Sequence, residues 1–232
     1  MKEIDDFTGK VLPVDDPLFV GRDDEIELFE DFLKPASQLR ILNFYTDGQG
    51  GVGKTTLLSH LQKRCDELHS DIFYNEDLID FHLENRNETE VMAGIAKSIG
   101  LEEFKQVEEK FREAAKKDIA EREKLGVESQ TRLFVEVYNK FAKNMSKEGK
   151  LIVLFFDTYE YAQQPSTTEE GKTEVTSTDF SNWLETELFV KLSNQENARL
   201  VIAGRCKPLK EKVFGASYKP ILLKPFSPEN TE

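Results

Sequence analysis

A short glycine-rich run that ends in a lysine and a threonine has the composition of a phosphate-binding loop. The pattern G-x-x-x-x-G-K-[ST] is met by Gly48-Gln49-Gly50-Gly51-Val52-Gly53-Lys54-Thr55. Glycines let the backbone approach a polyphosphate and turn its N–H groups inward. In this pattern the Lys54 ammonium reaches the β- and γ-phosphates, and the Thr55 hydroxyl ligates Mg²⁺. The run therefore predicts a site for a nucleoside polyphosphate with Mg²⁺.

The segments on either side of this loop predict the strand and the helix that must position it. Residues 39–46 are an apolar run typical of a buried strand, and a predicted helix behind the loop extends to about residue 69. A helix N-terminus favours a bound anion because its N–H groups are unpaired and its dipole is positive there. The alternative is a glycine-rich turn with only a structural role, which the strand–loop–helix order disfavours. The predicted phosphate contacts are Gly48, Gln49, Gly50, Gly51, Val52, Gly53, Lys54, Thr55 and Thr56.

A second candidate residue is the acid that follows the most apolar run of the chain. Residues 151–156 are apolar on both faces, as expected for a central parallel strand, and Asp157 comes directly after them. Ligands of open α/β sheets lie at the carboxyl ends of the strands. We expect this Walker B acid to hold Mg²⁺, directly or through a water. The alternative is an aspartate that only ends a strand.

Hydrolysis would also need a group that positions water near the γ-phosphate. Thr158 follows Asp157, and Glu160 is the next carboxylate. Two alternatives stay open for Glu160, a catalytic role at the γ-phosphate or a solvated loop position. Arg205 ends the apolar run 199–204, where it could contact the γ-phosphate, the alternative being a surface arginine.

Composition restricts the classes of partner. The chain has 232 residues and a formal net charge of -13, which argues against a broad nucleic-acid surface. No apolar run reaches membrane-spanning length, and the N-terminus is not a signal peptide. Cys65 and Cys206 lack metal or redox spacing, so we expect reduced structural thiols. These features predict a cytoplasmic protein without a membrane or nucleic-acid partner.

The chain alternates between predicted strands and helices, which is typical of a parallel α/β sheet. Asp23 is the expected N-cap of the first helix. Strands are expected at 39–46, 78–83, 151–157, 199–204 and 218–223, and helices at 24–34, 88–99, 128–145 and 180–192. The charged segment 101–125 has apolar residues at near-helical spacing, and 163–180 has loop composition.

Taken in order, these motifs resemble the nucleotide-binding domain of STAND signal-transduction ATPases, a group that includes NB-ARC and NACHT proteins. The resemblance covers about residues 18–226 and narrows the chain to STAND proteins or the related AAA+ branches. It is carried by Phe19-Val20-Gly21-Arg22-Asp23-Asp24-Glu25, the phosphate loop, the Walker B strand and Ala203-Gly204-Arg205.

The resemblance implies a fold and further site residues. The fold would be a P-loop NTPase three-layer sandwich with a parallel five-stranded sheet of order 5-1-4-3-2. Val20, Gly21 and Arg22 would line the adenine and ribose of ATP or ADP, and Arg205 would be the sensor-1 arginine. An extended arm at 1–18 would precede a nucleotide-binding domain at 19–226, in which 101–148 is a helical elaboration. Residues 227–232 would begin the linker to missing C-terminal winged-helix and sensor domains.

The resemblance also implies a function. In STAND proteins ADP locks a closed monomer, whereas ATP permits opening and homo-oligomerisation, and hydrolysis is slow. The chain would be the ATP-hydrolysing switch domain of a signalling or defence protein. Thr158 stands where the family has a second Walker B acid. Two alternatives therefore stay open, a nucleotide-binding scaffold with negligible hydrolysis and an AAA+ ATPase acting on DNA.

Overall fold

A parallel sheet forms the centre of the protein in a computed structural model that describes residues 21–48, 50–68, 71–82, 87–101, 126–163 and 176–225. The strand order is β2-β4-β5-β1-β6, and β3 also pairs with β4. All pairs are parallel. The strands are β1 (Ile41–Tyr45), β2 (Ile72–Tyr74), β3 (Ile79–Asp80), β4 (Leu151–Asp157), β5 (Ala198–Gly204) and β6 (Tyr218–Leu222).

The predicted α/β P-loop fold is confirmed, with one difference at the edge of the sheet. The predicted order 5-1-4-3-2 corresponds to β6, β1, β5, β4 and a single strand at 78–83. In the structure two short strands share this last position, because β2 pairs with the first half of β4 and β3 with its end. The described sheet therefore has six strands rather than five.

Asn75 explains the break between β2 and β3. Its fully buried side chain accepts a hydrogen bond from Phe155 N at 2.7 Å and donates one to Phe155 O at 3.0 Å. A side-chain amide thus makes the two bonds to β4 that a strand backbone would otherwise make. Gln62 on the facing helix donates to Asn75 O at 2.7 Å and holds the turn in place. β3 can then begin at Ile79 and end with Asp80 beside Asp157.

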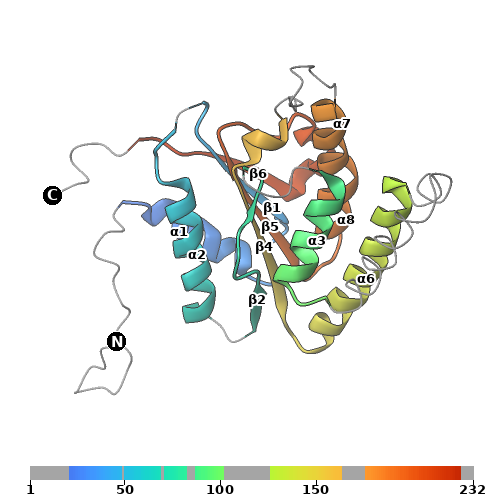
Figure 1. Ribbon diagram of the computed structural model, residues 1–232. Coiled ribbons are helices and arrows are strands. Elements are labelled where there is room, and N and C mark those ends of the chain that lie inside the picture. The colour runs from blue at the N-terminus through green and yellow to red at the C-terminus, as the bar shows by residue number, and fades with distance from the viewer. Residues whose placement is uncertain are drawn as a thin grey trace.

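Helices cover both faces of the sheet, which gives three layers (Figure 1). One face packs against α1 (Asp23–Leu33) and α2 (Lys54–Leu68) through a cluster that includes Val153 and Phe155. The other face presents Ile152, Leu154 and Phe156 to a second cluster. That cluster includes residues of α3 (Glu88–Ser98), α6 (Val127–Lys147), α7 (Thr176–Trp183), the π-helical turn η2 (Leu184–Leu188) and α8 (Phe189–Ser193). The 3-10 segments are η1 (Tyr159–Gln163) and η3 (Glu211–Ser217).

The expected helices are present, with two local corrections. Asp23 is the first residue of α1, and Arg22 precedes it as the N-cap, so the predicted capping role of Asp23 was wrong. The helix expected at 180–192 starts at Thr176 and contains the π-helical turn. Predictions for 1–18, 102–125, 164–175 and 227–232 lie outside the described residues.

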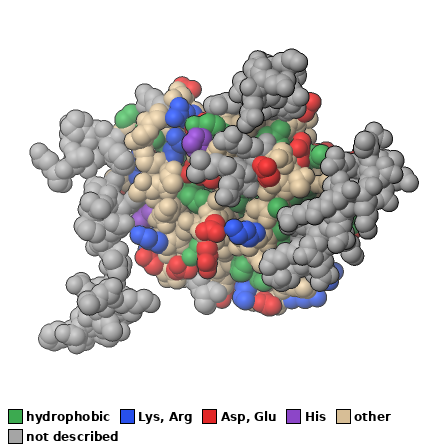
Figure 2. All heavy atoms as spheres, viewed as in Figure 1, with side chains coloured by type: hydrophobic (Ala, Val, Ile, Leu, Met, Phe, Trp, Pro, Cys, Tyr) green, Lys and Arg blue, Asp and Glu red, His purple; other side chains and the backbone are tan. Residues whose placement is uncertain are grey.

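The surface fits the acidic composition. On the face shown in Figure 2, the basic side chains of the described residues are interspersed with acidic ones and form no broad basic patch. Within the described ranges, no helix combines the length and the apolar composition that crossing a membrane requires.

Asn75→Ala should destabilise the protein, since it removes both partners of Phe155 while the strand backbone stays buried. Each buried polar group left unsatisfied costs about 1–3 kcal/mol. Urea unfolding should show this loss, whereas Asn194→Ala, at an exposed asparagine, should stay close to wild type. Equal stability of the two variants would contradict the bridging role of the Asn75 amide.

Candidate functional site

The phosphate-binding loop connects the end of β1 to the start of α2. Gly51 and Gly53 have φ values of 74° and 82°, a left-handed backbone that favours glycine. Leu57 N bonds to Gly53 O at 2.9 Å, so Lys54, Thr55 and Thr56 form the first helical turn. The N–H groups of a first turn have no partner within the helix and are available to an anion. The loop thus has the form predicted from its sequence.

The two predicted Mg²⁺ ligands lie in direct contact. The Thr55 hydroxyl donates to Asp157 Oδ2 at 2.6 Å, and Asp157 Oδ1 accepts from Thr158 N at 2.8 Å. Asp157 is 3% exposed, and this burial raises the pKa of its carboxyl against the opposing effect of the two hydrogen bonds. A nearby cation would offset the cost of burying this charge.

These residues fit a magnesium ion. Mg²⁺ prefers hard oxygen ligands and usually combines one or two protein oxygens with phosphate oxygens and waters. Thr55, in the first turn of α2, and Asp157, at the end of β4, supply two such oxygens. Among the described residues, no group of three or more His, Cys, Asp or Glu side chains forms a metal site. Two protein oxygens suit a metal whose other ligands come from a nucleotide and from water.

Glu160 and Arg205 form an ion pair beside the loop. Glu160 Oε1 lies 3.1 Å from Arg205 Nε, and Oε2 accepts from Arg205 N at 2.9 Å. Glu160 is only 9% exposed, so it is not a solvated loop residue. A Cβ at Gly204 would lie 3.1 Å from Glu160 Oε2, so a side chain at this position would crowd the carboxylate where β5 passes it.

Arg205 also contacts the phosphate-binding loop. Its carbonyl oxygen accepts from Gly48 N at 2.8 Å. Its Nη2 would lie 3.4 Å from a Cβ at Gly50, so the guanidinium rests against the loop. Although its side chain is half-exposed, Arg205 is positioned between the loop and Glu160 rather than turned toward solvent alone.

The N-terminal motif reaches the loop through Arg22. Val20 and Gln49 lie outside the described residues, and Gly21 has a φ of 76° just before Arg22. Arg22 is 6% exposed, and its Nη2 donates to Val52 O at 3.0 Å and to Lys224 O at 2.9 Å. One side chain therefore joins the phosphate loop to the segment that follows β6.

Sequence reasoning missed Asp80, which the sheet places beside Asp157. The two residues are partners in the parallel register of β3 and β4. Asp80 Oδ1 accepts a hydrogen bond from the Thr158 hydroxyl. The acid inside the predicted strand 78–83 gave no distinct signal, because a half-buried strand ordinarily alternates apolar and polar residues.

Neither Cys65 nor Cys206 has the properties of a reactive thiol. Both are free thiols, and burial raises the pKa of Cys65 to about 12 and that of Cys206 to about 11. Thiols with raised pKa values are poor nucleophiles and poor metal ligands. This agrees with the predicted structural role.

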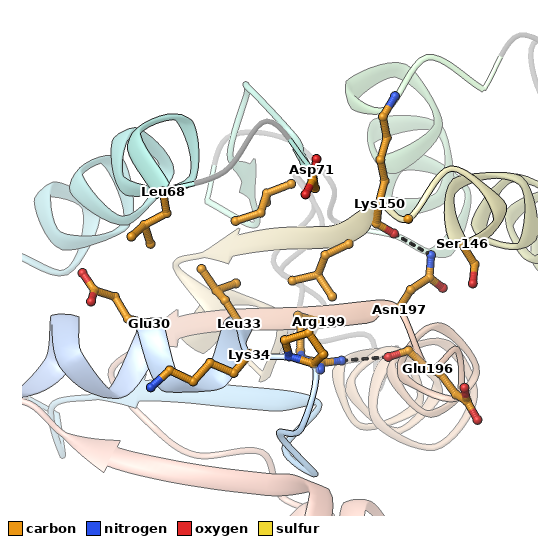
Figure 3. Close-up of a pocket in the computed structure, with 14 residues that line it drawn as sticks. Glu30, Leu33, Lys34, Leu68, Asp71, Ser146, Lys150, Glu196, Asn197 and Arg199 are labelled. Atoms are coloured by element: carbon orange, nitrogen blue, oxygen red, sulfur yellow. Dashed lines mark hydrogen bonds between the residues drawn. The ribbon is translucent and has the colours of Figure 1, made fainter. Parts of the chain in front are cut away.

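A cavity of about 550 Å³ lies at the opposite end of the strands (Figure 3). Arg199, at the start of β5, is 1% exposed and donates to Phe32 O and Glu196 O, each at 3.0 Å. Figure 3 shows Glu30, Leu33, Lys34 and Leu68 among the side chains that line this cavity. The cavity borders Leu151, whereas the phosphate loop meets the other end of β4 at Asp157. It is therefore separate from the candidate site.

Comparison with known protein families identifies the family of this chain. The family described as “AAA ATPase domain” matches residues 18–169, which is more than half of the chain and includes the phosphate loop, β3 and β4. The chain is also similar to a solved structure described as “Structure of Drosophila ORC bound to AT-rich DNA and Cdc6”. The identity is 8% and the TM-score 0.41, and the similarity covers 89% of this chain and 59% of the length of that chain. Comparison with curated proteins gives no match.

Asp157→Asn should raise the melting temperature in the absence of nucleotide and Mg²⁺. Burial raises the pKa of Asp157 above its ordinary 3.8, so the charged form is destabilising once the carboxyl is ionised in both states. The gain should be full at neutral pH and vanish below pH 3.8, where both states are protonated. Thermal melts from pH 7.5 downward test this, and a variant that melts below wild type at pH 7.5 would refute it.

Proposed function

The chain belongs to the AAA ATPase domain family, and from the order of its motifs we propose that it is the ATP-hydrolysing switch domain of a STAND-type signalling or defence protein. The observation that carries the proposal is the contact between Thr55 and Asp157. It joins the first turn of the helix behind the phosphate loop to the acid at the end of β4. A polyphosphate at this position would meet unpaired N–H groups and the proposed metal ligands together.

The proposed contacts follow from the geometry. The amides of residues 50–56 bind phosphate oxygens, and Lys54 adds a charge-assisted hydrogen bond. Gly21 and Arg22 would line the adenine and ribose, as the resemblance to STAND proteins implies. Bound Mg²⁺ would neutralise charge that develops on the phosphates during hydrolysis. Thr55 and Asp157 would hold it.

We propose that Arg205 detects the γ-phosphate and that Glu160 holds Arg205 in place. Both Glu160 oxygens contact Arg205, which supports a positioning role for this carboxylate. The guanidinium next to Gly50 could turn to a γ-phosphate, which ADP lacks. The contacts between the phosphate loop and the ends of β4 and β5 would then differ between the ATP-bound and the ADP-bound states.

Arg22 supports the proposed switch. Its contacts with Val52 O and Lys224 O join the phosphate loop to the exit from the sheet. A shift of the phosphate loop on nucleotide exchange would therefore change the position of the backbone at Lys224. In the proposed switch, this segment transmits the nucleotide state and controls opening and self-association in a cytoplasmic protein.

Lys54→Ala should weaken ATP and ADP binding about 10–100-fold, because hydrogen bonds to charged groups contribute about 1.5–3 kcal/mol. Titration with a fluorescent ADP analogue in Mg²⁺ measures this. Lys63→Ala, which removes an exposed lysine from the same helix, is the matched control and should bind as wild type does. Equal affinities for wild type and Lys54→Ala would rule out the proposed phosphate site.

Arg205→Ala should weaken ATP binding about tenfold more than ADP binding, since its proposed partner is the γ-phosphate, an interaction of about 1.5–3 kcal/mol. Glu160→Gln should change the ratio of the two affinities in the same direction but less, because the amide still accepts one hydrogen bond. Lys212→Ala removes an exposed cation from the following segment and should leave the ratio unchanged. If Arg205→Ala weakens both nucleotides equally, Arg205 does not distinguish them.

A further inference from the structure

Hydrolysis of ATP requires a group that orients the attacking water and accepts its proton. Three carboxylates lie at or just beyond the ends of β3 and β4. One is the proposed metal ligand Asp157, and a second, Glu160, pairs with Arg205. Asp157 bonds to Thr55 and to the backbone N–H of Thr158. Both oxygens of Glu160 contact Arg205, so Glu160 would have to release a cation before it could accept a proton.

Asp80 is the third carboxylate, and its position is fixed by the sheet. It is paired with Asp157, and residues paired in parallel strands direct their side chains to the same face. The Asp157 carboxylate points to α2, where it meets Thr55. Asp80 therefore lies on the α2 face too, and it adds to the rise in the pKa of Asp157, as expected for two carboxylates close together.

Thr158 supports this arrangement in a strained conformation. Its φ is 55°, and a β-branched residue rarely adopts a positive φ. Such strain persists only where the surroundings hold the residue in place. Here Thr158 N donates to Asp157 Oδ1, and its hydroxyl donates to Asp80 Oδ1. The strained residue thus connects the proposed metal ligand to Asp80.

We propose that Asp80 is the carboxylate that orients and deprotonates the attacking water, with Thr158 as its positioning residue. The inference rests on the proposed ATPase function. The water oxygen forms a bond to the γ-phosphorus while the bond from that phosphorus to the β,γ-bridging oxygen breaks. The bonding electron pair leaves with ADP. The water proton passes to the Asp80 carboxylate and then to solvent, which leaves ADP and inorganic phosphate.

Asp80 also has a structural role, which the test must separate. Its Oδ1 accepts from His82 N at 2.7 Å and so closes the turn after β3. An asparagine side chain has the same shape and keeps one acceptor oxygen for His82 N and the Thr158 hydroxyl. Asp80→Asn therefore keeps an acceptor for the turn and removes the charge and the basicity of the carboxylate.

The experiment compares wild type, Asp80→Asn and Asp77→Asn under single-turnover conditions with Mg²⁺ and ATP. Asp77 is an exposed acid in the same connection and serves as the matched control. We expect Asp80→Asn to hydrolyse ATP about 10²–10⁴-fold more slowly, the usual effect of losing a general base. Its dissociation constant for ATP and the Mg²⁺ concentration that half-saturates binding should stay within twofold of wild type. Asp77→Asn should match wild type in all three.

Several results would overturn the assignment. Hydrolysis by Asp80→Asn at the wild-type rate would do so, as would a rate that excess Mg²⁺ restores, because Asp80 would then hold metal. A greater loss in Glu160→Gln than in Asp80→Asn would assign the base to Glu160. If Asp80→Asn has a lower melting temperature than Asp77→Asn, a third variant, Asp80→Glu, provides the test. It keeps a carboxylate and should hydrolyse bound ATP faster than Asp80→Asn does. Equal rates for these two variants would overturn the proposal.

Failure of the proposed function gives a different result. Wild type would then hydrolyse no more ATP than Lys54→Ala, and the ATPase proposal and the role of Asp80 would fall together. Normal hydrolysis by both wild type and Asp80→Asn would overturn the role of Asp80 alone.

Discussion

The hydrogen bond from Thr55 to Asp157 is the contact on which the site depends. It connects the start of α2 to the end of β4, although β5 lies between β1 and β4 in the sheet. The bond requires that the loop after β1 cross over the end of β5, and glycines at 51 and 53 give the loop the backbone that this path needs. The burial of Asp157 makes its charge costly, so the same contact creates a place where a cation is favoured.

The other polar residues of the site occupy equivalent positions on neighbouring strands. These side chains are Asp80 and Asp157, the last residues of β3 and β4, and Arg205, the first residue after β5. Parallel strands bring these positions to one edge, so residues far apart in the chain meet there. The Gly204 backbone lets β5 pass close to Glu160, and this close approach forms the pair between Glu160 and Arg205.

The sequence was most informative where function depends on local order. The loop at 48–55, the strand at 151–157 and the helix behind the loop could each be predicted, because glycine spacing and apolar runs act within a few residues. Contacts made across the sheet were not predicted. Asn75 divides β2 from β3 through bonds to Phe155, 80 positions away, and nothing near Asn75 in the sequence indicates that partner.

The same limit applied to the acids of the site. Glu160 was singled out because it follows Asp157 closely, but its role depends on Arg205, 45 positions away. Asp80 was missed because its neighbour Thr158 is 78 positions away and is set by the register of β3 and β4. The π-helical turn Leu184–Leu188 was missed too, since its apolar spacing differs little from that of an α-helix.

The central claim is that Thr55 and Asp157 hold a metal ion beside a polyphosphate bound on residues 50–56. Crystals grown with Mn²⁺ and a non-hydrolysable ATP analogue would test it through the anomalous scattering of the metal. The account predicts one anomalous peak at the Thr55 hydroxyl and the Asp157 carboxylate, with phosphate oxygens on the loop amides. A fully occupied nucleotide whose metal lies away from both side chains, or whose phosphates lie off the loop, would contradict it.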